Sequence, residues 1–453
     1  MRTVLRAGLL LLLASSPLPF GAVQPWAILA IELAACAVGL LALTLLATRR
    51  AELPARAAWI GIAAGCVVAI GIVQLLPFRT TPVFASVEAA VGGATARPLS
   101  LSPADTVDAL VRFTAYALVA LAAAVAIATP RELRQLATVV AASGVFQAVY
   151  GSAEYLSGHQ HIFGYAKRYY FEEASGTFIN CNHFAGYLAM TLPFALGLLV
   201  DEWRRLPRRQ AATSRLLLLS EPAGVRLIAA AAAVALIFLG VILSYSRGGL
   251  IVALLGAAAF AWMSGMRRRR LGTLAALIVL PALFVSWMQV RAPGERFLSG
   301  DVASLGGRLP VWRATLRMVA DHPWLGSGWG TFEEAFPQYY PADIASHWEH
   351  AHSDWLQVLA EGGCLGAVAV GAGLLLAIRR DSSSFPLQKQ KDSLNAAVRA
   401  SLIGIGLYSL ADFSLRIPAI ALLTAAAGLA RIGGPAASSQ SVWRRTDGMP
   451  PAS

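Results

Sequence analysis

The sequence has 453 residues, of which 57% are hydrophobic and only 14% are charged, and its formal net charge is +12. Soluble globular chains have about 45–50% apolar and about 25% charged residues, so this composition excludes an ordinary soluble domain. A charge of this size on a soluble protein would suggest nucleic-acid binding. In a membrane protein, basic inner loops account for it, and we expect no nucleic-acid partner.

Twelve apolar stretches approach the length of about 20 residues that a transmembrane helix needs. They lie at residues 4–20, 24–48, 57–77, 107–128, 133–153, 182–200, 226–244, 248–265, 271–289, 355–378, 396–412 and 417–432. The first stretch is short and contains Pro17 and Pro19. Because Arg2 and Arg6 flank its apolar core, it also has the features of a signal peptide. We expect it to remain as an uncleaved helix.

The basic residues are concentrated in alternate connections between these stretches, which marks one side as cytoplasmic. The clusters are Arg49/Arg50/Arg56, Arg131/Arg134, Arg204/Arg205/Arg208/Arg209, Arg267 to Arg270, Arg379/Arg380/Lys389/Lys391 and Arg444/Arg445. We predict an all-α polytopic membrane protein of about twelve spans, with residues 1–432 as the transmembrane domain. The largest outer loop, at residues 290–354, precedes the tenth span. Residues 433–453 are predicted to be a disordered cytoplasmic tail.

Histidine is distributed unequally between the two predicted faces. Six of the seven histidines fall in outer segments, and His183 lies at the outer end of the sixth stretch. The six are His159, His161, His322, His347, His350 and His352. An interfacial belt explains outer tryptophans and tyrosines, but it does not explain histidines. The sequence therefore places any chemistry on the outer face.

A short outer connection between the seventh and eighth stretches has the sequence Ser246-Arg247-Gly248-Gly249. Only a few polar residues separate the two apolar runs, so Arg247 is held close to the membrane surface, where a charge is costly and often functional. Paired glycines allow a ligand to approach the backbone, and a guanidinium can bind phosphate oxygens through two parallel hydrogen bonds. An arginine that merely snorkels at a helix end remains the alternative.

The large outer loop contains a second basic motif, Gly306-Gly307-Arg308, followed by a short predicted amphipathic helix at 311–320. Arg308 lies near the positive end of that helix, where anions are favoured. Arg313 and Arg317 are four residues apart and share one face, which a solvated surface would also explain. The glycine-rich stretch 326–330 lacks the Lys-Ser/Thr ending of a phosphate-binding loop, so we expect only a turn-rich loop there.

The same loop ends in a histidine motif, His350-Ala351-His352. A histidine beside a membrane-proximal cavity suits general-base chemistry, and Glu349 or Asp354 is a candidate to orient it. The two histidines also raise the alternative of a metal pair, but their spacing is not the i,i+4 spacing of helical zinc ligands and no third ligand is evident.

A fourth polar motif opens the sixth stretch, with Asn180, Asn182 and His183 in close succession. Helix capping explains one asparagine. Three polar side chains together at the mouth of an apolar helix predict a polar lining to a cavity and possible substrate contacts.

These motifs, taken together, resemble the O-antigen ligase/polymerase superfamily of bacterial envelope glycosyltransferases. The resemblance covers about residues 170–370 and rests on four stretches: GTFINCNHFAGYL (176–188), SRGGL (246–250), GRLPVW with DHPWLGSGWGTF (307–332), and HAHSDWLQVLAEGG (350–363). The predicted topology, with one large outer loop before the tenth span, is similar as well.

The resemblance implies an all-helical, C-type glycosyltransferase of the bacterial inner membrane with its site facing the periplasm. It implies inverting transfer of a glycan from undecaprenyl diphosphate to a hydroxyl, without a metal or other cofactor. Arg247 and Arg308 match the family's diphosphate-binding arginines, and His352 matches its proposed base. His183, His350 and Arg313 remain candidates for substrate contacts, as do Asn180 and Asn182.

The acceptor stays open among lipid A-core, a second glycan and a protein side chain. Many relatives have Asn after the matching histidine, where this chain has Ser353; serine still donates and accepts hydrogen bonds. A transporter and a non-enzymatic assembly factor are the alternatives from other functional classes. A transporter predicts an inverted repeat and several polar groups at mid-membrane, whereas Glu32 is the lone mid-span carboxylate and no repeat is visible.

Overall fold

The computed structural model describes residues 1–53, 55–78, 98–206, 221–265, 308–340, 348–379 and 393–430, and every structural statement below concerns these residues. They form an all-α protein apart from a short hairpin of β1 (His161–Ile162) and β2 (Tyr165–Ala166). The predicted ninth span at 271–289 and the predicted tail at 433–453 lie outside the described residues.

Seven described helices are long and apolar enough to cross a membrane. They are α2 (Pro25–Ala47), α3 (Ala55–Gln74), α5 (Pro103–Ala126), α6 (Pro130–Ser157), α7 (Cys181–Arg205), α9 (Pro222–Leu243) and α15 (Asp354–Ile378). Four shorter helices coincide with further predicted spans: α1 (Arg2–Ser15), α10 (Arg247–Met263), α16 (Ser393–Tyr408) and α17 (Pro418–Leu429). The structure confirms a polytopic, helical chain, while the count of twelve spans stays a prediction.

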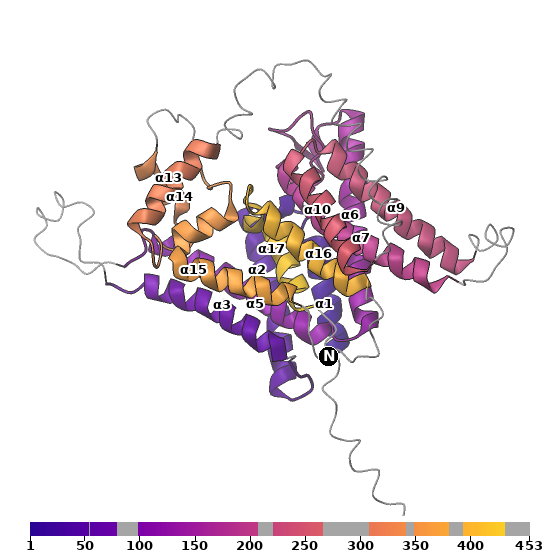
Figure 1. The fold of residues 1–453 in the computed structure, drawn as a ribbon, viewed down its shortest axis with the longest axis horizontal. Coiled ribbons are helices and arrows are strands. Elements are labelled where there is room, and N and C mark those ends of the chain that lie inside the picture. Colours follow the sequence, from indigo (N-terminus) through magenta and orange to yellow (C-terminus); the bar gives the residue numbers. More distant parts are fainter. Residues whose placement is uncertain are drawn as a thin grey trace, which may run out of the picture.

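Helix α7 has the most buried apolar window of the seven candidate spans and packs against α6, α9, α10 and α16 (Figure 1). Its apolar window is 89% buried, because small residues on its neighbours allow close contact. A Cβ at Gly197, for example, would lie 2.9 Å from the Cβ of Ala397 in α16. Small residues at helix contacts are typical of membrane bundles, where packing rather than water exclusion drives association.

The N-terminal helix α1 ends at Ser15, earlier than the predicted stretch 4–20. Pro17 and Pro19 explain the difference, since a proline has no backbone N–H to donate to the preceding turn of a helix. Leu5 and Leu9 of α1 are fully buried. At its start, Arg6 forms an ion pair with Glu132 of α6 at 2.5 Å.

The large outer loop contains α13 (Arg308–Asp321), α14 (Phe332–Ala335) and the 3₁₀ helix η3 (Phe336–Tyr339), which lie beside α15 (Figure 1). The predicted helix at 311–320 is confirmed. Its buried face carries Val311, Ala314 and Met318, at the spacing of one helical face. Leu316 of the same helix lies off this face and is 53% exposed.

The glycine-rich stretch 326–330 joins this loop to α15. The amides of Ser327 and Gly328 donate to the carbonyls of Ala360 and Glu361 at 3.0 and 3.1 Å, and Trp329 is fully buried. Gly326 has φ +70°, and a Cβ there would collide with the backbone of Glu361. The glycines are therefore needed for close backbone contact, as a turn-rich loop predicts.

We expect Gly326→Ala to destabilise the protein by at least about 2 kcal/mol, because it combines an unfavourable positive φ with a backbone collision. The measurement is the melting temperature of the purified protein in detergent. Gly61→Ala is the matched control, since nothing lies within 4 Å of a Cβ at Gly61 and alanine favours a helix. Equal melting temperatures for the two variants would contradict this role of the loop.

Candidate functional site

Three histidines surround one aromatic ring at the end of the bundle where α7 begins. The ring centroids of His183, His350 and His352 lie 4.6, 4.5 and 4.8 Å from that of Phe413. Phe413 belongs to the short connection between α16 and the 3₁₀ helix η5 (Ser414–Arg416). The structure thus brings together three predicted site residues from two motifs that are far apart in the sequence.

His352 is the histidine whose environment best suits a base. Its backbone has φ +51°, which is uncommon for a non-glycine residue and is often a feature of functional sites. Burial and, to a smaller extent, the nearby Arg308 guanidinium lower the pKa of His352 to about 4, while Asp412 opposes the shift. The buried Nδ1 atom has no hydrogen-bond partner among the described residues. A neutral ring with a nitrogen of this kind is able to accept a proton.

Arg308 reaches the same connection from the start of α13. Its guanidinium donates a hydrogen bond to the carbonyl of Ala411, and Nη2 lies 4.0 Å from Oδ1 of Asp412. The side chain remains 26% exposed, so it is partly accessible to a ligand. The structure thus brings Arg308 to the connection that also holds Phe413.

Asp412 is the carboxylate at the centre of this cluster, and the sequence motifs did not predict its role. It is buried, its Oδ2 lies 3.7 Å from Nε2 of His183, and it accepts a hydrogen bond from Ser414 Oγ at 2.6 Å. Asp354, one of the two carboxylates expected to orient a histidine, instead accepts the amide of Leu415 at 2.9 Å. The available signal was an acidic residue at the end of the predicted apolar stretch 396–412.

A second network holds His350 from the α15 side, and the motifs did not predict it either. Gln357 Nε2 lies 3.3 Å from Nδ1 of His350 and donates to Glu361 Oε1 at 2.8 Å. Glu361 is fully buried and pairs with Arg416 at 2.7 Å. Burial lowers the pKa of Arg416, but the adjacent Glu361 carboxylate more than offsets it and the net shift is upward. Burial, aided by Arg416, lowers the pKa of His350 to about 3.

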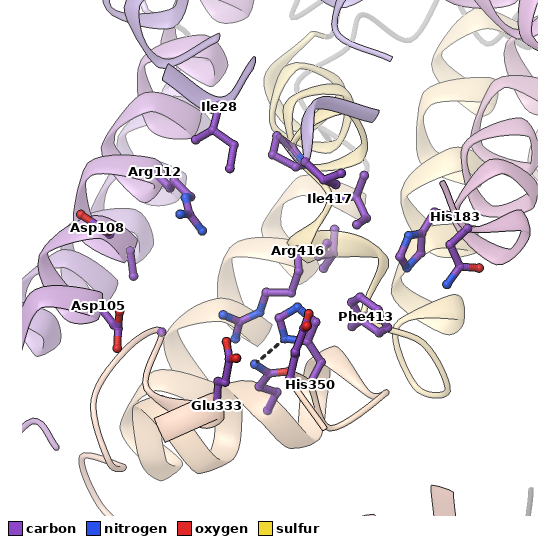
Figure 2. Close-up of a pocket in the computed structure, with 18 of the residues that line it drawn as sticks. Ile28, Asp105, Asp108, Arg112, His183, Glu333, His350, Phe413, Arg416 and Ile417 are labelled. Atoms are coloured by element: carbon purple, nitrogen blue, oxygen red, sulfur yellow. Dashed lines mark hydrogen bonds between the residues drawn. The ribbon is translucent and has the colours of Figure 1, made fainter. Parts of the chain in front are cut away.

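A cavity of about 500 Å³ opens beside the histidines (Figure 2). His183, His350 and Phe413 form part of its wall, together with Asn180. Figure 2 shows Arg112 of α5 and Arg416 of η5 extending into it from different sides. The polar cavity lining predicted at the start of the sixth stretch is confirmed for Asn180 and His183.

The Ser246 motif contacts the start of α7 through hydrogen bonds. Ser246 Oγ caps α10 by accepting the amide of Gly249 at 3.2 Å and donates to Asn182 Oδ1 at 2.8 Å. Tyr408 donates to the carbonyl of Asn182 at 2.9 Å. Asn182 therefore has a structural role as a hydrogen-bond partner of Ser246 and Tyr408. Arg247 is exposed at the first position of α10.

Asn180 caps α7 by accepting the amide of Asn182 at 2.8 Å. Arg313 is exposed on α13 and does not line the cavity, as expected of a solvated face. Among the described residues, no group of three or more His, Cys, Asp or Glu side chains is arranged to hold a metal ion.

Residues 232–371 match the family model described as O-antigen ligase. This segment is therefore similar to the O-antigen ligase family. The match confirms the resemblance drawn from the motifs, and the O-antigen ligase segment includes Arg247, Arg308, His350 and His352. No curated protein matches the chain.

Several groups of the site lie outside the matched O-antigen ligase segment. His183 comes from α7, and Asp412 and Arg416 come from the connection before α17. The site is therefore completed by helices on both sides of the matched segment, which bring their polar groups to the same end of the bundle.

Proposed function

We propose that this protein transfers an oligo- or polysaccharide from undecaprenyl diphosphate to an acceptor hydroxyl on the periplasmic face of the bacterial inner membrane. The observation that carries the proposal is the placement of His352 beside the Arg308 guanidinium. The ring of His352 is neutral, and its Nδ1 has no hydrogen-bond partner among the described residues. The segment similar to the O-antigen ligase family contains both residues.

In this mechanism the neutral imidazole of His352 accepts the proton of the acceptor hydroxyl as that oxygen attacks the anomeric carbon of the donor. A new C–O bond forms, and the C–O bond to the diphosphate breaks with its electron pair on the leaving oxygen. Direct displacement inverts the anomeric centre. Holding both reactants in line contributes much of the rate.

Arg308 binds the donor diphosphate and stabilises the negative charge that grows on it as it leaves. Such stabilisation accelerates the reaction because it is stronger in the transition state than in the ground state. Arg247 is the second diphosphate ligand, exposed at the membrane-proximal start of α10. Asp412 acts through its neighbours as a positioning residue, since it faces both Arg308 and His183 and favours the protonated form of His352.

The orientation of the site follows from the charge distribution along α7. His183 lies in the first turn of α7 and Arg204 and Arg205 lie in its last turn. At 1.5 Å per residue these positions are about 30 Å apart, which is the thickness of the hydrocarbon core. The positive-inside rule favours a cytoplasmic location for the basic end, which supports the proposal that the histidine cluster faces the periplasm.

We expect the rate of glycan transfer to fall only as the pH approaches about 4. Protonation removes the lone pair that accepts the proton, and the lowered pKa of His352 keeps the ring neutral down to about that pH. The measurement is the transfer rate between pH 4 and pH 8 with purified protein. A midpoint near 6.5, the ordinary value for histidine, would contradict the buried geometry.

The same shift also affects stability, so melting temperatures must be recorded across this range. The unfolded chain binds more protons at this histidine between about pH 4 and 6.5, so its contribution makes the folded state less stable as the pH falls through that window. The melting temperatures distinguish a loss of activity caused by unfolding from a loss caused by protonation of His352.

Gene deletion with complementation tests the proposal in cells. The strains carry wild-type protein, Arg247→Ala, Arg308→Ala or His352→Ala at matched membrane levels, and surface glycans, glycoproteins and lipid-linked precursors are analysed by gels and mass spectrometry. We expect the deletion to lose one glycan product and accumulate its lipid-linked precursor, with none of the variants restoring it. Full rescue by the variants at equal expression would contradict the assignment and favour an assembly factor or transporter.

A further inference from the structure

The cavity of about 500 Å³ and the proposed diphosphate site lie on different sides of the histidine cluster. The cavity is lined by His183, His350 and Phe413, but neither Arg308 nor His352 belongs to its lining. His352 nevertheless belongs to the cluster, with its ring 4.8 Å from that of Phe413, and Arg308 lies 4.0 Å from the neighbouring Asp412. The structure therefore offers a second compartment beside the one assigned to the leaving group.

The lining of this cavity is rich in carboxylates. Asp105 and Asp108 of α5 form one wall, and Glu333 and Glu349 of the outer loop contribute further carboxylates (Figure 2). Asp105, Asp108 and Glu349 form no ion pair with any described residue. Ionised carboxylates are hydrogen-bond acceptors only, so this wall is suited to a ligand that presents donors.

The two arginines of the cavity do not reverse this charge. Arg416 pairs with the buried Glu361 at 2.7 Å, and Nε of Arg112 lies 3.8 Å from Oε1 of Glu32. The described lining residues include four carboxylates and only these two guanidinium groups, so the net charge of the lining is negative. A diphosphate or a heavily phosphorylated ligand would be repelled there, because like charges in a partly dry site interact strongly.

Two buried polar atoms of the lining residues, Nε of Arg112 and Nε2 of His183, have no hydrogen-bond partner among the described residues. His183 is only 6% exposed, and its Nε2 atom has no hydrogen-bond partner among the described residues. The nearest charged group, Oδ2 of Asp412, is 3.7 Å away, beyond normal hydrogen-bond length. Buried polar atoms are generally satisfied, so this atom indicates a ligand group that occupies the cavity.

We propose that this cavity binds the acceptor, and that it selects an uncharged, hydroxyl-rich sugar rather than a phosphorylated one. The inference rests on the proposed glycan transfer. Sugar hydroxyls donate to Asp105, Asp108 and Glu349, and one hydroxyl meets His183. The attacking hydroxyl then passes Phe413 towards His352, while the donor diphosphate stays on the Arg308 side.

The test is a transfer assay with the full-length protein in nanodiscs. Lipid-linked donor and envelope glycans are extracted from the deletion strain, and the glycans are separated into phosphorylated and unphosphorylated fractions by anion exchange. Wild-type protein should modify the unphosphorylated fraction. We expect Asp105→Asn combined with Asp108→Asn to raise the acceptor KM at least tenfold, while the donor KM changes less than twofold.

Two further variants sharpen the result. Arg308→Ala should show the reverse pattern, with a raised donor KM. Glu334→Gln is the matched control, because Glu334 is exposed and does not line the cavity, and it should change neither constant. Melting temperatures exclude unfolding as the cause.

The outcomes separate the two proposals. Transfer by wild type only to the phosphorylated fraction, or an unchanged acceptor KM in the aspartate double variant, would overturn the acceptor inference and leave the proposed function standing. Absence of transfer to either fraction by wild type would overturn the proposed function and the inference with it.

Discussion

Replacing His352 with alanine is expected to lower the rate of glycan transfer by a factor of about 10²–10⁴, the usual contribution of a general base. The physical reason is the loss of the neutral, buried nitrogen that accepts the hydroxyl proton. Because His352 is packed between Trp348 and Phe413, at ring distances of 5.0 and 4.8 Å, His352→Gln is a second variant that retains much of the side-chain volume. The measurement is kcat with purified protein.

His159→Ala provides the matched control for His352. His159 is exposed and lies on the same face in the loop before β1, so its removal tests for a general effect of losing an outer histidine. We expect wild-type kcat for His159→Ala and a comparable loss for both His352 variants. Retention of more than about a tenth of the wild-type rate by His352→Gln would show that another group removes the proton.

Replacing Arg416 with alanine is expected to destabilise the protein by about 3–5 kcal/mol, the usual cost of removing one partner from a buried ion pair. Glu361 is fully buried and would keep a charge without its counter-ion. The remaining hydrogen bonds, from Gln357 at 2.8 Å and from the amide of Gly330 at 2.9 Å, only partly replace it. The measurement is the melting temperature together with the yield of folded protein from membranes.

The double variant Arg416→Ala with Glu361→Gln separates lost charge pairing from lost packing. It should be more stable than Arg416→Ala alone, because the buried charge is removed as well. Arg205→Ala is the surface control: its i,i+4 pair with Asp201 is 59% exposed on the arginine side and contributes only about 0.3–0.5 kcal/mol. A double variant that is no more stable than Arg416→Ala would contradict the role of the ion pair.

Sequence patterns were sufficient for those parts of the fold that are set by local composition. Apolar length predicted α2, α5, α7 and α9 within a few residues, since lipid requires each span to satisfy its backbone hydrogen bonds internally. The buried face of α13 was harder to predict, because its contacts come from α15 and η3 rather than from the helix itself.

In the candidate site too, residues whose partners are distant in the sequence could not be predicted. His183, His350, His352 and Arg308 were predicted because they belong to recognisable polar motifs in an apolar chain. Asp412 and Arg416 were not, because they lie singly in a short connection, and their partners His183 and Glu361 are 229 and 55 positions away in the sequence. Only the folded structure shows that this connection contacts the histidine motif.

The most direct test of the central claim is reconstitution of glycan transfer with the purified full-length protein. Lipid-linked donor and the acceptor fraction from the deletion strain are mixed with wild-type or Arg308→Ala protein, and the elongated acceptor and the released undecaprenyl diphosphate are quantified by mass spectrometry. We predict equal molar amounts of both products with wild type and at least a hundredfold lower rate with Arg308→Ala. Release of undecaprenyl diphosphate without an elongated acceptor, or equal rates for the two proteins, would contradict the proposed transfer.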